Sequence, residues 1–82
     1  MLKTVMVKIE DIYIPAARRS ELDPNKVEEI CNAVIEDVEQ RPIQVRKGNG
    51  RLVLVKGINR LEARKALGDE TIGAYMVSAQ QH

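Results

Sequence analysis

The junction at Lys56-Gly57 constrains the fold of this chain more than any other feature of its sequence. An apolar run typical of a strand, RLVLVK (Arg51–Lys56), ends there, and a helical pattern, NRLEARKALG, begins at Asn59. A glycine between a strand and a helix permits a positive φ or a close approach of the backbone. Because the first amides of a helix are unpaired and attract anions, this junction is either a phosphate site or a plain turn.

The first half of the sequence predicts one strand and one helix. Alternating apolar residues in Thr4–Ile14 predict a half-buried strand that Pro15 stops, and the polar segment that follows is expected to be a connection. Asp23 is a good N-cap and Pro24 suits the first helical position, so a helix is expected near Pro24–Val38. Its apolar face is expected to contain Val27, Ile30, Cys31, Val34, Ile35 and Val38.

The second half predicts a hairpin, a short helix and a last strand. Arg41–Lys47 and Arg51–Lys56 read as two strands joined by a tight turn at Gly48–Gly50. The short helix is expected near Asn59–Leu67, with Gly68 as its stop, and the last strand over Glu70–Ser78. The resulting order is β-α-β-β-α-β, which predicts a compact, single-domain α+β fold over residues 1–82, with a frayed tail at 78–82.

Composition narrows the classes of function. The 13 basic and 12 acidic residues give a net charge of +1, which does not favour strong non-specific DNA binding. One Cys and one His cannot form an internal disulfide or a conventional zinc site. No apolar run approaches the roughly 20 residues of a membrane span, and no signal peptide is visible. We therefore expect a soluble, cytoplasmic protein without a membrane partner.

Four basic side chains could converge on the junction. Arg60 could bind phosphate oxygens beside the first amides of the second helix, which Asn59 could cap. Lys26 lies in the first turn of the first helix, where a cation is unfavourable unless an anion is near. Arg18 and Arg19 follow the first strand and could add donors. Spacing alone favours the alternative, a plain turn with Arg60 in solvent, and Cys31 is expected to be a core thiol.

The order of RRSELDPNKV, RPIQV and GINRLEARKALG, followed by ETI, resembles the ParB/sulfiredoxin superfamily over about residues 5–77. The resemblance implies a nucleotide fold: sulfiredoxins bind ATP, ParB proteins bind CTP, and a related archaeal branch phosphorylates free serine. In this superfamily the box at the second helix holds phosphates. Gly57 and Arg60 match that box, and Lys26 matches a nucleotide-contacting lysine of sulfiredoxins. Arg18 or Arg19 matches a family arginine by region only.

Departures from the superfamily pattern limit what the resemblance implies. Ile58 stands where sulfiredoxins have their catalytic cysteine, so repair of sulfinic acid by that mechanism is excluded. Asn59 replaces the box histidine, which keeps a hydrogen-bonding group but loses acid–base chemistry. Glu29 and Ala33 replace two small hydroxyl residues. The 82 residues contain no helix-turn-helix or dimerisation domain of ParB type, so they are not expected to form a clamp on DNA.

The leading interpretation is a domain that binds a nucleotide or another phosphate-bearing ligand, with ATP or CTP and Mg²⁺ as the cofactors the resemblance implies. The predicted site consists of Gly57, Ile58, Asn59, Arg60, Lys26, Arg18 and Arg19. Nucleotide hydrolysis, phosphotransfer and the oligomeric state stay open. One alternative is a nucleic-acid-associated module for partition, regulation or nuclease activity, with weak DNA binding. A second alternative is an interaction domain without a ligand.

Overall fold

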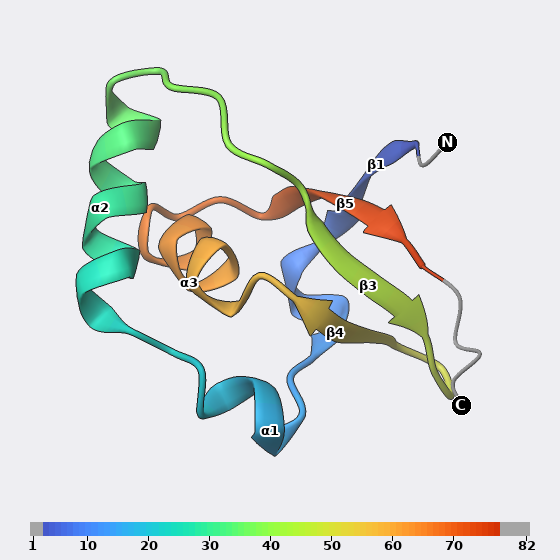
Figure 1. The fold of residues 1–82 in the computed structure, drawn as a ribbon. Coiled ribbons are helices and arrows are strands. Elements are labelled where there is room, and N and C mark those ends of the chain that lie inside the picture. Colours follow the sequence, from blue (N-terminus) through green and yellow to red (C-terminus); the bar gives the residue numbers. More distant parts are fainter. Residues whose placement is uncertain (1–2, 78–82) are drawn as a thin grey trace.

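A computed structural model describes residues 3–77 of the chain. The described residues form an α+β domain in which a mixed sheet is covered by helices (Figure 1). The elements in chain order are β1 (Thr4–Lys8), a 3₁₀ turn (Ile9–Asp11), β2 (Ile12–Tyr13), α1 (Ala16–Arg19), α2 (Pro24–Ile35), β3 (Ile43–Lys47), β4 (Leu52–Lys56), α3 (Ile58–Ala66) and β5 (Thr71–Met76). The predicted α+β class and β-α-β-β-α-β order are confirmed, with additions near the N-terminus.

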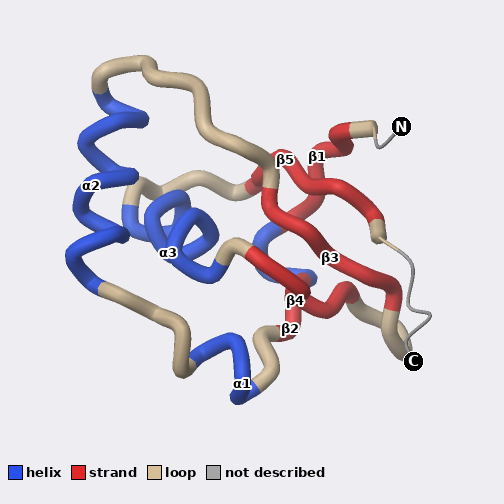
Figure 2. Tube along the Cα trace, in the orientation of Figure 1, coloured by secondary structure: helices blue, strands red, loops and turns tan. Residues whose placement is uncertain are grey.

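The five-stranded sheet has the order β1-β5-β3-β4-β2 (Figure 2). The pairs β1/β5 and β3/β4 are antiparallel, whereas β3/β5 and β4/β2 are parallel. Helix α3 contacts β3 on one side and α2 on the other, so it lies between the sheet and the outer helix (Figure 1). The core between α3 and the sheet contains Ile14, Ile43, Val45, Leu54, Ile58, Leu61, Ile72 and Ala74.

The predicted first strand is interrupted, because the chain must move from one edge of the sheet to the other. Strand β1 pairs with β5 at one edge, and β2 pairs with β4 at the opposite edge. The 3₁₀ turn at Ile9–Asp11 makes the transition, and the Ile9 amide donates to the Glu70 carbonyl at 3.0 Å. The segment after Pro15 also differs from its prediction as a simple connection, since it forms the helical turn α1.

Helix α2 ends at Ile35, before the predicted end at Val38, because Asp37 adopts a φ of +66°. The Asp37 amide donates to the Val34 carbonyl at 3.0 Å, and the Val38 amide donates to the Ala33 carbonyl at 2.8 Å. This pair of bonds is a Schellman motif, whose left-handed position is usually glycine. The end of the expected apolar face is not buried, since Ile35, the last residue of the helix, is 70% exposed and Val38, after the motif, is 52% exposed.

Helix α3 ends in the same motif, but with the predicted glycine. Gly68 has a φ of +85°, its amide donates to the Lys65 carbonyl, and the Asp69 amide donates to the Arg64 carbonyl. Gly68 is therefore confirmed as the stop of this helix. The last strand ends at Met76, and the tail predicted to fray at 78–82 lies outside the described residues.

The two helix ends lead to a stability prediction for Asp37. Replacing Asp37 with glycine removes the steric cost of a Cβ at positive φ, so we expect Asp37→Gly to raise the free energy of unfolding by about 0.5–1 kcal/mol. The neighbouring Glu36 has a φ of −84° and is the matched control. Glu36→Gly should lower the free energy of unfolding by a similar amount. Urea denaturation measures both, and a loss of stability in Asp37→Gly would contradict this account.

Candidate functional site

Gly57 fixes where α3 begins. It has a φ of +110° and a ψ of 32°, a left-handed conformation that side chains rarely tolerate. A Cβ on Gly57 would lie 2.7 Å from Cγ2 of Ile43 and 3.1 Å from Nη2 of Arg60. Ile43 is fully buried, so it cannot move aside without disturbing the core. Both the conformation and the space therefore require glycine at the junction of β4 and α3.

The first turn of α3 leaves its backbone donors unpaired. Gly57 is the N-cap, with no side-chain cap, and the first helical bond runs from the Leu61 amide to the Gly57 carbonyl at 2.9 Å. Within residues 3–77, no group accepts a hydrogen bond from the amides of Ile58, Asn59 or Arg60. These donors and the positive end of the helix dipole are the features that attract anions.

Asn59 does not cap its own helix, and that prediction was wrong. Ile58 occupies the first helical position, so Asn59 lies inside the first turn, and its Oδ1 accepts a hydrogen bond from the Asp23 amide at 2.8 Å. Asp23 is itself the N-cap of α2 and accepts from the Asn25 amide at 3.0 Å. Asn59 therefore links the start of α3 to the start of α2, and the positive ends of both helices converge.

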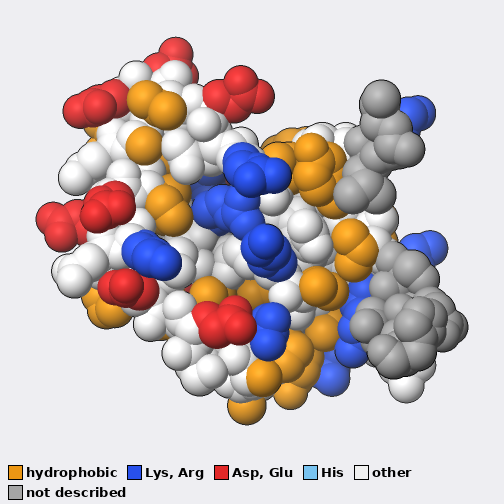
Figure 3. Space-filling model, in the orientation of Figure 1, with side chains coloured by type: hydrophobic (Ala, Val, Ile, Leu, Met, Phe, Trp, Pro, Cys, Tyr) orange, Lys and Arg blue, Asp and Glu red, His pale blue; other side chains and the backbone are white. Residues whose placement is uncertain are grey.

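The phosphate hollow, as we name it, is a cavity of about 420 Å³ beside these two helix starts. Its lining residues are Glu21, Lys26, Ile30, Gln40, Arg41, Lys56, Gly57, Ile58, Asn59 and Arg60. Four of them are basic and one is acidic. Figure 3 shows basic side chains gathered between the helices and the sheet on this face of the molecule. Two helix dipoles and an excess of positive side chains make the hollow electropositive.

Arg60 has no anionic partner in the described part of the chain. Its Nη1 donates to the Arg41 carbonyl at 3.3 Å, and no carboxylate of residues 3–77 forms an ion pair with it. Burial lowers the pKa of Arg60, and the nearby charge of Arg41 lowers it further. The guanidinium stays charged at neutral pH because arginine titrates far above it. A structural ion pair, the simplest explanation for a half-buried arginine, is therefore not formed within residues 3–77.

The structure brings together some of the predicted site residues and not others. Lys26 and the four residues from Gly57 to Arg60 line the phosphate hollow. Arg18 and Arg19 do not, because their side chains bind elsewhere. Arg18 donates to the Val55 carbonyl at 3.1 Å and pairs with Glu21 at 3.2 Å, and Arg19 donates to the Ile14 carbonyl at 3.3 Å. The Arg18 pair partly neutralises the one carboxylate that lines the hollow.

Sequence reasoning missed Arg41 and Lys56 as lining residues. Both were assigned to strands, and no periodic pattern distinguishes a basic residue at a strand end from a solvated one. Lys56 directly precedes Gly57, so its position next to the junction could have identified it as a lining residue. Arg41 reaches the hollow from the loop between α2 and β3, which only the fold reveals.

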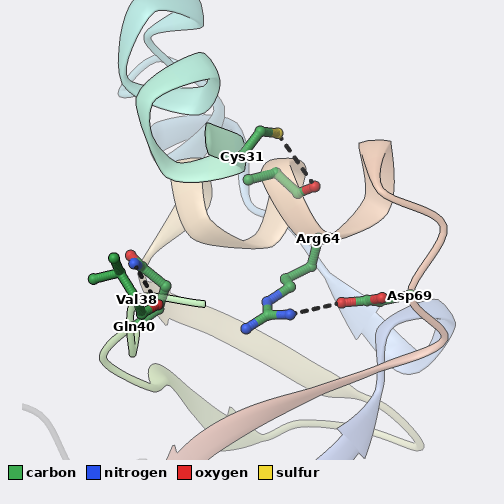
Figure 4. A network of polar contacts seen from close by, with 6 residues as sticks. Cys31, Val38, Gln40, Arg64 and Asp69 are labelled. Carbon is green, nitrogen blue, oxygen red and sulfur yellow. Dashed lines mark hydrogen bonds and ion pairs between the residues drawn. The ribbon is translucent and has the colours of Figure 1, made fainter. Parts of the chain in front are cut away.

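Cys31 lies on the face of α2 that contacts α3, as its place on the predicted apolar face implied, but it is half-buried and not fully buried as a core thiol would be. Its partly buried thiol donates to the Ala63 carbonyl with a sulfur–oxygen distance of 3.6 Å, as Figure 4 shows. In the same view Arg64 pairs with Asp69 at 2.9 Å and Gln40 donates to the Val38 carbonyl. Cys31 does not line the phosphate hollow, so its contact is a packing contact between helices.

Within residues 3–77, the structure contains neither a candidate metal centre nor a membrane-spanning helix. No group of three or more His, Cys, Asp or Glu side chains lies close enough to hold a metal ion. No helix in this part of the chain has the length and apolar character needed to cross a membrane.

The class of protein follows from the fold, from the hollow beside the start of α3 and from comparison with known proteins. The model of the ParB N-terminal domain family matches residues 2–82, and the chain belongs to this family. A probable chromosome-partitioning protein ParB from Campylobacter jejuni is 31% identical over 81 residues. This match covers 98% of the present chain but only 29% of that relative, so the chain spans less than a third of its length.

Solved structures place the domain in the ParB/sulfiredoxin superfamily, as the resemblance implied. Sulfiredoxin from Arabidopsis thaliana aligns with a TM-score of 0.80 and 30% identity, covering 94% of this chain and 86% of that one. The C-terminally truncated ParB of Caulobacter crescentus, complexed with CTP-gamma-S, aligns with a TM-score of 0.76 and 22% identity. That match covers 96% of this chain and 46% of the Caulobacter protein, and it shows the shared fold.

The contact between Gly57 and Ile43 leads to a second stability prediction. Gly57→Ala adds both a positive-φ cost and a clash with the core, so we expect it to lower the free energy of unfolding by about 2–4 kcal/mol. Gly68 is the matched control, because its φ is also positive but a Cβ there would meet nothing within 4 Å. Gly68→Ala should cost only about 1–2 kcal/mol. Equal losses in the two variants, measured by urea denaturation, would show that Ile43 does not constrain the junction.

Proposed function

We propose that this domain binds a nucleotide, with its phosphates in the phosphate hollow against the first turn of α3. The observation that carries the proposal is Arg60, a partly desolvated arginine without a carboxylate partner in residues 3–77, beside three unpaired helix amides. Partial burial removes some of the water around this charge, and an anion bound beside it would compensate that loss. Amides, guanidinium and Lys26 together provide donors of the kind that phosphate oxygens accept.

The comparisons support a nucleotide as the phosphate-bearing ligand. The Caulobacter ParB structure contains CTP-gamma-S, and its domain shares the fold of this chain. The resemblance to sulfiredoxins implies ATP as the alternative to CTP. The phosphate hollow binds the part that these ligands share, so we leave the choice of base to the experiment below.

The hollow does not provide a dedicated protein site for Mg²⁺. Glu21 is the one carboxylate in its lining, and it already pairs with Arg18 at 3.2 Å. Mg²⁺ that accompanies a nucleotide is commonly held by phosphate oxygens and water with one or two carboxylates. We therefore propose that any Mg²⁺ enters with the nucleotide and contributes to affinity through the phosphates and not through protein ligands.

We propose binding and not turnover as the role of the hollow. Hydrolysis or phosphotransfer requires a group that positions or activates a nucleophile. The lining contains no histidine or cysteine, and its single carboxylate is paired. Ile58, at the position of the sulfiredoxin cysteine, is a buried core residue, so its aliphatic side chain provides no nucleophile.

A thermal-shift panel tests the proposal directly. The panel consists of ATP, ADP, CTP, CDP and GTP, each with and without Mg²⁺, against the wild type, Arg60→Ala and Arg51→Ala. At ligand near 100 times Kd, wild type should gain about 2.7 kcal/mol, on the order of 10 °C for so small a domain. Arg60→Ala should lose this gain, while its unliganded form loses about 1 kcal/mol or less, because one exposed hydrogen bond disappears.

Arg51 is the matched control for charge. It lies over the Tyr13 ring at 3.9 Å and does not line the phosphate hollow, so Arg51→Ala should keep the full ligand shift. If no nucleotide stabilises the wild type at millimolar concentration, the site is not a nucleotide site. The chain is then better explained as an interaction domain without a ligand. If Arg60→Ala unfolds without ligand, the arginine is structural.

A second candidate function is association with DNA, as part of a partition system. It is favoured by the likeness to a probable chromosome-partitioning protein, and it is compatible with nucleotide binding. We propose the cytoplasm as the location for either function. Because the net charge is only +1, the chain is expected to bind duplex DNA weakly, with Kd in the non-specific range of roughly 10⁻⁴ to 10⁻⁶ M.

Fluorescence anisotropy with labelled duplexes of several sequences checks the DNA prediction. Affinity should fall steeply between 50 and 200 mM salt, because binding that releases counterions follows salt concentration in this way. Sequence-specific binding in the nanomolar range at physiological salt would contradict it and would make direct DNA recognition the main activity of this chain.

A further inference from the structure

The two edges of the sheet differ in how well they are protected against pairing with another chain. At one edge, β2 (Ile12–Tyr13) has only two residues, and Pro15 follows shortly after it. A short edge strand and a proline are both features that prevent such pairing. At the other edge, β1 (Thr4–Lys8) is a strand of five residues that pairs with β5 on one side. Within residues 3–77, no strand pairs with its outer side.

The direction of the backbone groups of β1 follows from a hydrogen bond at its end. The Ile9 amide donates to the Glu70 carbonyl at 3.0 Å, which continues the antiparallel register of β1 and β5 by one position. In such a pair, residues that bond to the neighbouring strand alternate with residues whose N–H and C=O groups point away from it. Counting back from Ile9, the residues that point away from β5 are Thr4, Met6 and Lys8.

The sequence of β1 is complementary to itself in an antiparallel arrangement. A two-fold axis through Met6 places Val5 opposite Val7 of a second copy, and β-branched residues are favourable neighbours across strands. The same register places Thr4 opposite Lys8 of the second copy, so no two like charges are opposed. Val5 and Met6 are 38% and 65% exposed, and pairing covers part of this apolar surface.

The fold also limits how far such an assembly can grow. The pairing ends at Lys8, because Ile9 begins the 3₁₀ turn that leaves this edge. A two-fold contact uses the same surface of both copies, so it occupies both β1 edges and closes. The β2 edge, with its two residues, offers little to extend the sheet further. The net charge of +1 adds only weak repulsion between two copies.

We propose that β1 is a self-association edge, at which two copies of this chain pair antiparallel about Met6 and join their sheets into one. No residue of β1 lines the phosphate hollow, so the inference is independent of the proposed function. Pairing through one short strand gives a small interface. The dimer is therefore weak, with a Kd of about 10 µM to 1 mM.

Sedimentation equilibrium of the whole chain, from about 20 µM to 2 mM, tests the inference, since this range brackets the expected Kd. Wild type should show a monomer–dimer equilibrium. Met6→Pro removes an N–H that points away from β5, and proline is tolerated at such edge positions, so this variant should fold and weaken the dimer at least about 10-fold. Met6→Thr is the matched control, because it keeps the N–H and a strand-forming residue, and it should change Kd less than about 3-fold.

Charge variants of Thr4 test the register and do not depend on the tolerance of β1 for proline. Thr4→Glu places a carboxylate opposite Lys8 of the other copy in both symmetric pairs, so it should tighten the dimer about 3- to 10-fold. Thr4→Lys should weaken it by a similar factor. Asn32→Glu and Asn32→Lys make the same changes of net charge on the exposed side of α2, and they should leave Kd unchanged.

Two results would overturn the inference. The first is a single species with the mass of one chain at every concentration, which is also the result expected if β1 pairs only with an extended peptide of another protein. The second is a dimer that Met6→Pro does not weaken more than Met6→Thr does, and that the charge at position 4 does not affect, because such a dimer uses another surface. Melting temperatures show whether each variant is folded.

Discussion

The close contact between the Gly57 backbone and the buried Ile43 side chain is the constraint on which the site depends. It sets the direction in which the chain leaves β4, so the first turn of α3 begins directly on the core. Asn59 then lies where it can accept from the Asp23 amide, which places the start of α2 beside the start of α3. The close approach of the two helix starts, and the phosphate hollow beside them, therefore depend on Gly57.

The positive charge of the site depends on how the charged side chains are arranged and not on the net charge of the chain. The chain carries a net charge of only +1, yet the phosphate hollow has four basic side chains and one acidic one. Acidic side chains pair with Arg18, Arg64 and Lys65, and in the described residues no carboxylate pairs with the four basic side chains of the hollow, which are Lys26, Arg41, Lys56 and Arg60. A local field of this kind attracts a small anion at short range without making the domain a general binder of nucleic acid.

Local signals in the sequence were sufficient for most of the fold. Asp23-Pro24 at the start of α2, Gly57 before α3 and Gly68 after it were read correctly because each acts on the backbone of its own or the next residues. The end of α2 was misplaced because Asp37 adopts a conformation for which glycine is the usual signal. The break between β1 and β2 was missed because it is set by their partners β5 and β4, which lie far along the sequence.

In the candidate site, too, local features could be predicted from the sequence and contacts between distant segments could not. Lys26 and the Gly57–Arg60 segment were predicted from helix starts and from the superfamily resemblance, and they line one hollow. The partner of Asn59 and the position of Arg41 depend on how loops from distant segments meet, which no spacing within the chain encodes. Arg18 and Arg19 were assigned by region only, and contacts with nearby carbonyls direct them elsewhere.

The central claim is that phosphate binds at the first turn of α3, and backbone NMR tests it most directly. In a titration of ¹⁵N-labelled chain with CTP or ATP, the largest amide shift changes should occur at Ile58, Asn59 and Arg60, with Lys26 also affected. These amides have no acceptor in the described structure and would gain one from the ligand. Changes that concentrate instead at the β2–β4 edge, around Tyr13 and Arg51, would place the ligand elsewhere and contradict the account.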